Sequence, residues 1–438
     1  MVQELKINLD TPEYAVSDAQ RIPTLDYPSQ MKAIPPSRMF TIKTALKTYL
    51  GKAGDGASTY DASQGDGGAS LPGVPHKYLE RALELQIEHG TGYDKPFGTE
   101  MFRTATAEQY WNFSDESGFG AENIIFTQGG RDALNKAYNA MIALGHGRKG
   151  DLLVVSRVPW ISYNWGPYAM GLNVLRAPGQ PEDGWKYTPD SIRACVEFAQ
   201  RDGRNIAGIV ITSPDNPTGR TIPVSEQIEL ARTALDAGIS YVLFDWIYHW
   251  VTEGSPNDIN EVLEAFPPED RKRLMFLDGL TKSLGASNVR SAHLVAGKDV
   301  IKYINSQASH GVIPSFYAQA VAIAAYEDGF ANAAKFVAEP AAGSRRVLRD
   351  ALDAENMTYI MGDGYYAFID VSQAIKAGDL GDSEKLGSIL AEDFGIAVVP
   401  GVFFSSAGAN WVRFSYAQPP ERTEKAVARF FEGLKSFG

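Results

Sequence analysis

The chain has 438 residues, 44% of them hydrophobic and 21% charged, a length and balance typical of a globular protein with two domains. A formal charge of −12 argues against nucleic acid or an anionic membrane as the main partner, and the single cysteine, Cys195, excludes an intramolecular disulfide. We expect a soluble cytoplasmic protein, since the sequence contains no secretory signal and no apolar run of the roughly 18 residues that a membrane helix needs.

The N-terminal region predicts an arm followed by one helix. Residues 1–36 are rich in proline, which breaks long helices, so this segment is expected to be irregular and extended. Ser37 is a suitable N-cap for an amphipathic helix over residues 38–50. A glycine-rich stretch follows, and we expect residues 1–60 to join the smaller of two domains.

Short apolar runs alternate with helical segments in the middle of the chain. The predicted strands cover residues 124–127, 152–156, 206–212, 241–244, 274–277 and 292–296, and the predicted helices cover 131–144, 191–200 and 225–237. This alternation predicts an α/β fold with a mainly parallel sheet between helices, in a large domain of residues 61–315. Long helices with strands near 365–371, 396–399 and 411–416 predict a smaller α+β C-terminal domain of residues 316–438.

Several residues that carry chemistry fall where predicted strands end, which is where ligands bind in open α/β sheets. Gly129, Gly130 and Arg131 lie between a strand and a helix N-terminus, where free N–H groups and the helix dipole attract a phosphate. A tight turn is the simpler interpretation of that motif alone. The segment 213–219 contains two prolines and a glycine, which predict a rigid turn that directs the side chain of Asn216.

Three charged residues interrupt apolar runs and so require partners. Asp245 ends one run, which predicts either a helix cap or a cationic partner such as a protonated ring nitrogen, and Tyr248 would place a phenol near the same ligand. Lys282 follows another apolar run among small residues, which suits an amine that attacks an aldehyde. Arg413 lies in a predicted strand and calls for a planar anion, which is either a structural carboxylate or that of a substrate.

In this order and spacing the motifs resemble those of the class I/II aminotransferases, the fold type I pyridoxal-phosphate enzymes, over residues 65–416. The matching positions are Asn216–Gly219 for the family's Asn-Pro-Thr-Gly motif, Asp245 and Tyr248 for its Asp-x-x-Tyr motif, Lys282 for its Schiff-base lysine, Arg290 for its phosphate-binding arginine and Arg413 for its substrate arginine. The resemblance implies pyridoxal 5'-phosphate as the cofactor.

Weaker matches concern three more residues. Tyr93 resembles the tyrosine that reaches the phosphate of a neighbouring subunit, so the resemblance implies a homodimer with active sites shared across the interface. Trp160 resembles the aromatic residue that stacks on the cofactor and is preferred here to Tyr163, although a core aromatic is the alternative for both Tyr93 and Trp160. Gly65 resembles the family's glycine beside the substrate.

The chain also departs from the family pattern. Gly279 stands where a hydroxyl residue is often found three positions before the lysine, and Thr281 is expected to supply the missing phosphate contact. Further departures are Asn288 and Ala292 in place of glycines around the arginine, Trp246 in place of an acidic residue, and Gly65–Gly68 in place of Gly-Glu-Pro. None of these changes removes a group that is needed to hold the cofactor.

The resemblance therefore implies an aminotransferase that moves the amino group of an α-amino acid to a 2-oxo acid through a Schiff base on Lys282, which also carries the proton. The implied contacts are Asp245 with the ring nitrogen, Asn216 and Tyr248 with the phenolic oxygen, Thr281, Arg290 and the amides of Gly130 and Arg131 with the phosphate, and Arg413 with the substrate carboxylate beside Asn216 and Gly65.

Other functions share part of this pattern. C–S lyases, eliminases and amino-acid cyclases carry the same residues, so the sequence leaves the fate of the substrate open. A non-catalytic cofactor-binding regulator would normally have an N-terminal DNA-binding domain, for which the proline-rich arm is too short. No metal site is expected, since the six histidines are scattered. Side-chain specificity is also open, because no second arginine for a dicarboxylic substrate can be located, and Trp246, Trp250, Tyr365 and Tyr366 are only candidates for a pocket wall.

Overall fold

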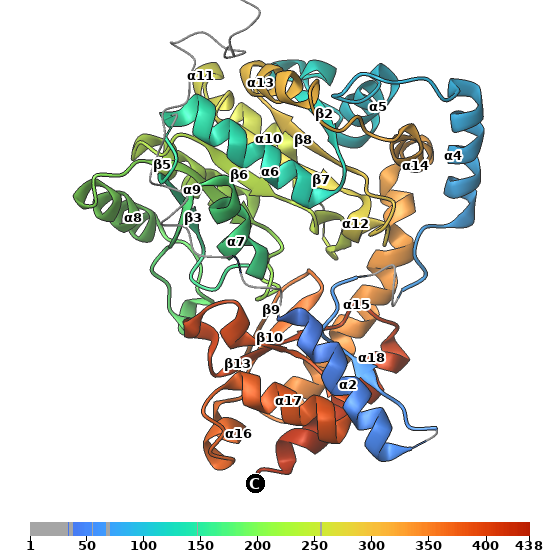
Figure 1. Ribbon diagram of the computed structural model, residues 1–438, viewed down its shortest axis with the longest axis vertical. Coiled ribbons are helices and arrows are strands. Elements are labelled where there is room, and N and C mark those ends of the chain that lie inside the picture. The colour runs from blue at the N-terminus through green and yellow to red at the C-terminus, as the bar shows by residue number, and fades with distance from the viewer. Residues whose placement is uncertain (1–33, 35–37, 55, 67–70, 147, 255) are drawn as a thin grey trace, which may run out of the picture. The chain divides into compact units, whose positions relative to one another are not determined.

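The structure is a computed structural model that describes residue 34 and residues 38–54, 56–66, 71–146, 148–254 and 256–438 (Figure 1). Residues 38–438 belong to one compact unit. The predictions of an extended arm before residue 34 and of an N-cap at Ser37 lie outside the described residues. None of the described helices is long and apolar enough to cross a membrane.

A seven-stranded sheet forms the centre of the larger part of the fold. Its strands, in spatial order, are β2 (Ile124–Thr127), β8 (Ala292–Ala296), β7 (Leu274–Gly279), β6 (Val242–Asp245), β5 (Ile206–Thr212), β3 (Leu152–Val155) and β4 (Asn173–Arg176). Only β8 runs against its neighbours, so the predicted mainly parallel sheet is confirmed. The edge strand β4 was not predicted, because its residues are half-buried or exposed and form no apolar run.

Helices cover both faces of this sheet, because its strands are buried on both sides (Figure 1). One face carries α6 (Gly130–Ala140), α7 (Ile161–Met170) and α13 (Lys298–Ala308). The other carries α5 (Glu100–Ala105), α8 (Pro189–Arg201), α9 (Val224–Asp236), α10 (Ile259–Glu264) and α14 (Phe316–Glu327), and α4 (His76–His89) packs against α14. Along β7, Phe276 packs into the second face and Leu277 into the first, as the alternation of a strand requires.

A smaller sheet lies in the C-terminal part of the chain. It contains four antiparallel strands in the order β12 (Val399–Pro400), β13 (Trp411–Ser415), β10 (Tyr366–Asp370) and β9 (Tyr359–Met361). A separate pair joins β1 (Tyr60–Asp61) to β11 (Ile396–Ala397). The accompanying helices are α2 (Met39–Ala53), α15 (Phe330–Ala354), α16 (Ser372–Ala377), α17 (Ser383–Phe394) and α18 (Pro420–Lys435).

The N-terminal helix α2 lies beside α17 near the end of the chain, as the blue and orange ribbons of Figure 1 show. The pairing of β1 with β11 ties the following segment to the same C-terminal part. Residues 39–61 therefore lie with the C-terminal part, ahead of the segments that build the large sheet. The boundaries at residues 60 and 315 stay a prediction.

Two short helices flank β7 in the chain: α11 (Pro268–Arg271) precedes it, and α12 (Leu280–Ser283) follows it directly. The carboxyl ends of β5, β6 and β7 carry Thr212, Asp245 and Gly279. These ends point toward the small sheet, and the space between them holds the cavity described next.

Candidate active site

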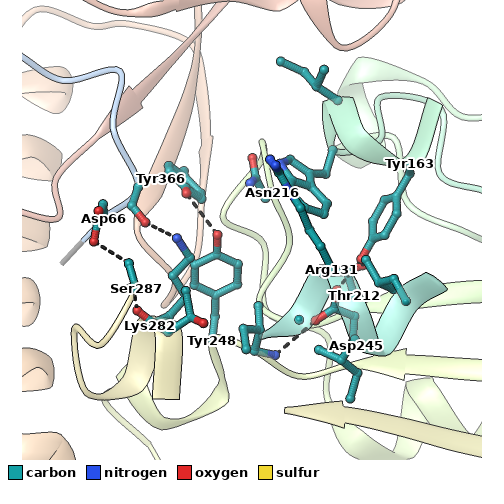
Figure 2. Close-up of a pocket in the computed structure, with 18 of the residues that line it drawn as sticks. Asp66, Arg131, Tyr163, Thr212, Asn216, Asp245, Tyr248, Lys282, Ser287 and Tyr366 are labelled. Carbon is teal, nitrogen blue, oxygen red and sulfur yellow. Dashed lines mark hydrogen bonds between the residues drawn. The ribbon is translucent and has the colours of Figure 1, made fainter. Parts of the chain in front are cut away.

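A cavity of about 550 Å³ opens at the carboxyl edge of the large sheet and is also lined by residues of the small sheet (Figure 2). This volume falls within the roughly 300–1,000 Å³ typical of ligand sites. The predicted site residues among its lining are Gly65, Gly130, Arg131, Trp160, Asn216, Asp245, Tyr248, Thr281, Lys282, Arg290 and Arg413. The fold thus brings together residues from segments more than 300 positions apart, as the hydrogen bond between Arg413 and Ser63 illustrates (|i−j| = 350).

One end of the cavity is formed by the N-terminus of α6. Gly129 precedes this helix with a φ of 87°, and a Cβ atom at this position would lie 2.2 Å from Arg290 Nη2. Arg290 is oriented by donating to the carbonyls of Ser287 (2.8 Å) and Gln128 (3.0 Å). The free amides of the helix and a guanidinium therefore meet at one point, which is the arrangement that binds a phosphate.

Asp245 lies at the end of β6, buried beside the cavity. Tyr163 donates its hydroxyl to Asp245 Oδ2, and the amide of Ile247 donates to Oδ1 at 3.2 Å (Figure 2). Burial raises the pKa of Asp245 to about 6, against the opposing effect of these two hydrogen bonds. A cation placed here, such as a protonated ring nitrogen, would restore the charged form.

Lys282 projects from α12 into the same space and donates to the carbonyl of Gly65 (Figure 2). Tyr248 and Tyr366 share a hydrogen bond between their hydroxyls, 3.0 Å apart. Burial raises the pKa of Tyr248 well above its ordinary value, so its hydroxyl keeps a proton to donate. A Cβ atom on Gly65 would lie 1.6 Å from the Tyr366 hydroxyl, so only glycine allows this approach.

Arg413, on β13, is only 4% exposed and faces the cavity from the small sheet. Its Nη1 donates to Asn216 Oδ1 (2.7 Å) and its Nη2 to the carbonyl of Ser63 (2.6 Å), and its guanidinium lies 4.2 Å from the centre of the Tyr366 ring. Its Nε is buried without a partner among the described residues. No carboxylate forms an ion pair with this guanidinium in the described part of the chain, which leaves it to bind an external anion.

The departure at Gly279 has a spatial cause. Gly279 and Ala292 face each other in register on β7 and β8, and a Cβ atom on Gly279 would lie 2.5 Å from the Ala292 Cβ atom, 2.6 Å from the Ala292 Cα atom and 2.7 Å from the Ser291 carbonyl oxygen. No hydroxyl side chain fits at position 279. Thr281 lines the cavity instead, and its hydroxyl is buried without a partner in the described structure.

These observations fit pyridoxal 5'-phosphate. The helix N-terminus and Arg290 suit its phosphate, the unpartnered Thr281 hydroxyl suits a phosphate oxygen, and Asp245 suits its ring nitrogen. Lys282 lies in the same cavity, as its aldehyde requires. The donor set and the cavity therefore match the cofactor that the sequence predicted.

Two predicted residues do not line the cavity. Gly129 lies behind Gly130, at the cap of α6. Tyr93 is 96% exposed and makes no contact with the cavity of its own chain. Trp160 does line it, with its ring 5.5 Å from the guanidinium carbon of Arg131.

Sequence reasoning missed several residues of the site. The sequence favours Trp160 over Tyr163 as the site aromatic, yet both line the cavity, and the Tyr163 hydroxyl donates to Asp245. Asp66 accepts a hydrogen bond from Ser287, and both lie at the wall (Figure 2). Of the four aromatic residues considered for the pocket wall, Tyr366 lines the cavity, whereas Trp246, Trp250 and Tyr365 do not.

A mainly parallel sheet with a lysine, a carboxylate and a phosphate-binding helix at its carboxyl edge, beside a smaller C-terminal sheet, defines the fold type I pyridoxal-phosphate enzymes. The family model for "Aminotransferase class I and II" matches residues 61–430, and the chain belongs to this family.

Relatives and solved structures agree with that membership. The aspartate/prephenate aminotransferase of Thermus thermophilus is 28% identical over 82% of this chain and 87% of its own length. The aspartate aminotransferase of Geobacillus stearothermophilus is 24% identical over 83% of this chain and 88% of its own length. A structure of aspartate aminotransferase from Thermus thermophilus with maleate superposes with a TM-score of 0.77 at 25% identity, covering 94% of this chain and all of that one (100%). The protein is therefore a pyridoxal-phosphate-dependent aminotransferase that acts on an amino acid and a 2-oxo acid.

Proposed function

We propose that Lys282 is the catalytic lysine of this aminotransferase and that the cavity residues hold the cofactor around it. The single observation that carries this proposal is the convergence of Lys282, Asp245 and the α6 N-terminus on one cavity. When bound, pyridoxal 5'-phosphate supplies an aldehyde that accepts the substrate amine and a ring that withdraws electrons.

Each residue then has a defined task. Asp245 keeps the ring nitrogen protonated, and Asn216 with Tyr248 donates to the phenolic oxygen. The amides of Gly130 and Arg131, with Arg290 and the Thr281 hydroxyl, hold the phosphate, while Trp160 covers a face of the ring. Lys282 Nζ would carry the proton to and from the substrate α-carbon, a task that contributes about 10² to 10⁴ in rate.

The test of this proposal is a trapping experiment. Borohydride reduction of the loaded enzyme should fix the cofactor mass to the peptide that contains Lys282, as read by mass spectrometry. Lys282→Ala should carry no such mass and should lose turnover. Full turnover in Lys282→Ala, or the cofactor mass on another lysine, would overturn the proposal. Ammonia release without a new amino acid product would instead favour an eliminase.

We further propose an acidic amino acid as a substrate, bound by two arginines. Arg413 would hold the α-carboxylate in a bidentate fork, beside Gly65 and Asn216. The Arg131 side chain also lines the cavity and has no carboxylate partner in the described residues, so it can meet a second carboxylate. The names of the relatives, and the dicarboxylate maleate in the solved structure, support this class of substrate.

Arg131→Leu tests this specificity. The variant should lose about 10- to 100-fold in kcat/KM for aspartate relative to a neutral donor such as alanine, because one charged hydrogen-bonded contact is lost. Arg131→Lys is the matched control and should recover part of the preference. Equal losses for aspartate and alanine would instead assign Arg131 to cofactor binding.

We also propose a homodimer in the cytoplasm. Exposed apolar side chains near the start of the large domain, Leu83, Ile87 and Tyr93, together with Val312, are suited to burial against a second copy. Tyr93 would then reach the phosphate of the partner's site. Mixing Lys282→Ala subunits with Tyr93→Ala subunits should restore activity in hybrid dimers. A monomer in sedimentation, or no restoration, would contradict the shared site.

A further inference from the structure

A cluster of buried polar side chains lies behind the active site, on the opposite face of the large sheet. Leu277 of β7 faces the cavity, so Asp278, the next residue, faces away from it. Asp278 is fully buried and His249 is 1% exposed. The function proposed above assigns no task to either residue.

Three donors converge on the Asp278 carboxylate. His249 Nδ1 lies 2.7 Å from Oδ2, the Tyr110 hydroxyl donates to Oδ2 at 2.5 Å, and the amide of Gly279 donates to Oδ1 at 2.6 Å. Because a carboxylate only accepts, His249 must carry its proton on Nδ1, which also lies 2.9 Å from the Trp246 carbonyl. The His249 side chain is thereby fixed in tautomer and in direction.

Rings from two further elements pack around His249 and Asp278: Trp111, from the π-helix Thr106–Trp111, and His293, from β8. The Trp111 ring stacks on His249 with an interplanar angle of 10°, and its Nε1 donates to His293 Nε2 at 2.9 Å. His293, on β8, is the cross-strand partner of Asp278, and burial lowers its pKa to about 4, so it stays neutral beside the carboxylate. The cluster is rigid because each member is packed against aromatic rings.

His249 and Asp278 are adjacent in the chain to segments that carry residues of the proposed active site. His249 directly follows Tyr248, and Asp278 directly precedes Gly279, where the chain turns into α12 and Lys282. On the far side of that turn, the Tyr365 hydroxyl donates to the Lys282 carbonyl at 2.6 Å, so the turn is held at both ends. The contact between His249 and Asp278 is therefore a cross-link between the two loops that present Tyr248 and Lys282.

We propose that His249 and Asp278 are positioning residues that fix Tyr248 and Lys282 relative to one another. This inference rests on the roles proposed above for those two residues. A displacement of about 1 Å at a reacting group can cost about 100-fold in rate, so loss of the cross-link should lower kcat rather than substrate affinity. The charge on Asp278 also adds, after burial, to the raised pKa of Asp245, so the cluster and the site are coupled electrostatically.

The experiment compares His249→Leu, His249→Asn and Asp278→Asn with a matched control. His249→Asn keeps an N–H donor near the Nδ1 position, and Asp278→Asn keeps the shape of the side chain. The control is Asn123→Ala, which removes a buried hydrogen bond to the Ala296 carbonyl and a half-buried one from the Gly120 amide, at the far end of β2 and β8. Steady-state rates, melting temperature and the labelling rate of Lys282 by an amine-reactive reagent in cofactor-free protein are measured for each.

His249→Leu should lower kcat by about tenfold or more with KM within about twofold, and should change the Lys282 labelling rate several-fold. His249→Asn should recover most of the loss, and Asp278→Asn should shift both quantities in the same direction as His249→Leu. Asn123→Ala should lower the melting temperature and leave kcat and labelling unchanged.

A wild-type kcat and a wild-type Lys282 labelling rate in His249→Leu would overturn the inference. So would an Asn123→Ala variant that lowers the melting temperature as much as His249→Leu does and also loses as much kcat. If His249→Leu does not fold, wild-type behaviour of Asp278→Asn would overturn it in the same way. Lys282→Ala separates the two proposals: turnover in that variant sinks the proposed function, whereas an inactive Lys282→Ala beside an unaffected His249→Leu sinks only the cross-link.

Discussion

Replacing Asp245 by asparagine should stabilise the cofactor-free protein at neutral pH. Burial raises the pKa of Asp245 from 3.8 to about 6, so the folded chain holds this proton more tightly than the unfolded chain does. The charged carboxylate therefore destabilises the fold above about pH 6, and this cost disappears as the pH falls toward 3.8. Each unit by which the folded pKa exceeds the unfolded pKa corresponds to roughly 1.4 kcal/mol, so the charged Asp245 carboxylate lowers the free energy of unfolding by about 3 kcal/mol at neutral pH.

The asparagine removes this cost but loses one acceptor. Asp245 accepts from both Tyr163 and the Ile247 amide, and an asparagine has a single oxygen for the two donors. A lost hydrogen bond costs about 1 kcal/mol, which leaves a net gain of about 2 kcal/mol. For a chain of 438 residues, this gain corresponds to a melting temperature higher by roughly 2 °C.

The assay is thermal unfolding of cofactor-free wild type and Asp245→Asn at about pH 7.5 and about pH 4.5. The stabilisation should be present at the higher pH and shrink or reverse at the lower one. Saturating pyridoxal phosphate is the internal control, since it should stabilise the wild type more than the variant. A variant that is less stable by the same amount at both values of pH would show that Asp245 carries no burial cost.

Three further substitutions test the rest of the site. Arg413→Lys should lower kcat/KM for every amino acid tested by about 10- to 100-fold, because the bidentate fork is lost, and a loss confined to acidic donors would contradict that role. Thr281→Val should weaken cofactor binding severalfold in an equilibrium titration yet leave the stability of the cofactor-free protein unchanged or higher, since the hydroxyl has no partner in the described structure. Gly279→Ser should destabilise the protein by about 1–3 kcal/mol in chemical denaturation. Adding Ala292→Gly should relieve little of this loss, because the Ala292 Cα atom and the Ser291 carbonyl oxygen would still lie 2.6 and 2.7 Å from the new Cβ atom.

The strands of the large sheet could be predicted because each is a short run of buried apolar residues bounded by turns. The same reasoning missed β4, where Asn173 and Arg176 stand at the ends of a half-exposed edge strand. It also predicts a helix over residues 131–144, whereas the structure has an α-helix over Gly130–Ala140 that continues as a π-helix over Met141–His146. Burial of side chains sets the pattern that sequence reasoning detects, so partly exposed elements escape it.

The candidate site could be predicted in part because its polar residues follow apolar strands, where an unpaired charge demands an explanation. The hydrogen-bond partners of those residues could not be predicted. Tyr163 and Asp245, for example, are 82 positions apart in the chain, and no local sequence pattern indicates that they are in contact. The histidines illustrate the same limit. They are scattered in sequence, yet the pairing of β7 with β8 and the turn after β6 bring His249 and His293 to Asp278.

The departures from the family pattern at positions 279 and 281 are best understood together. Gly279 faces Ala292 across the β7–β8 register, and a Cβ atom at position 279 would lie 2.5 Å from the Ala292 Cβ atom, 2.6 Å from the Ala292 Cα atom and 2.7 Å from the Ser291 carbonyl oxygen. The backbone of β8 as well as the Ala292 side chain therefore excludes a hydroxyl residue at position 279, and a hydroxyl group for the phosphate has to come from elsewhere on the turn. Thr281 lies two residues further along that turn, at the cavity wall, with its hydroxyl unpartnered among the described residues. Under the proposed function Thr281 would therefore supply the donor that Gly279 lacks, because the requirement is the position of an oxygen in space and not the position of a residue in the chain.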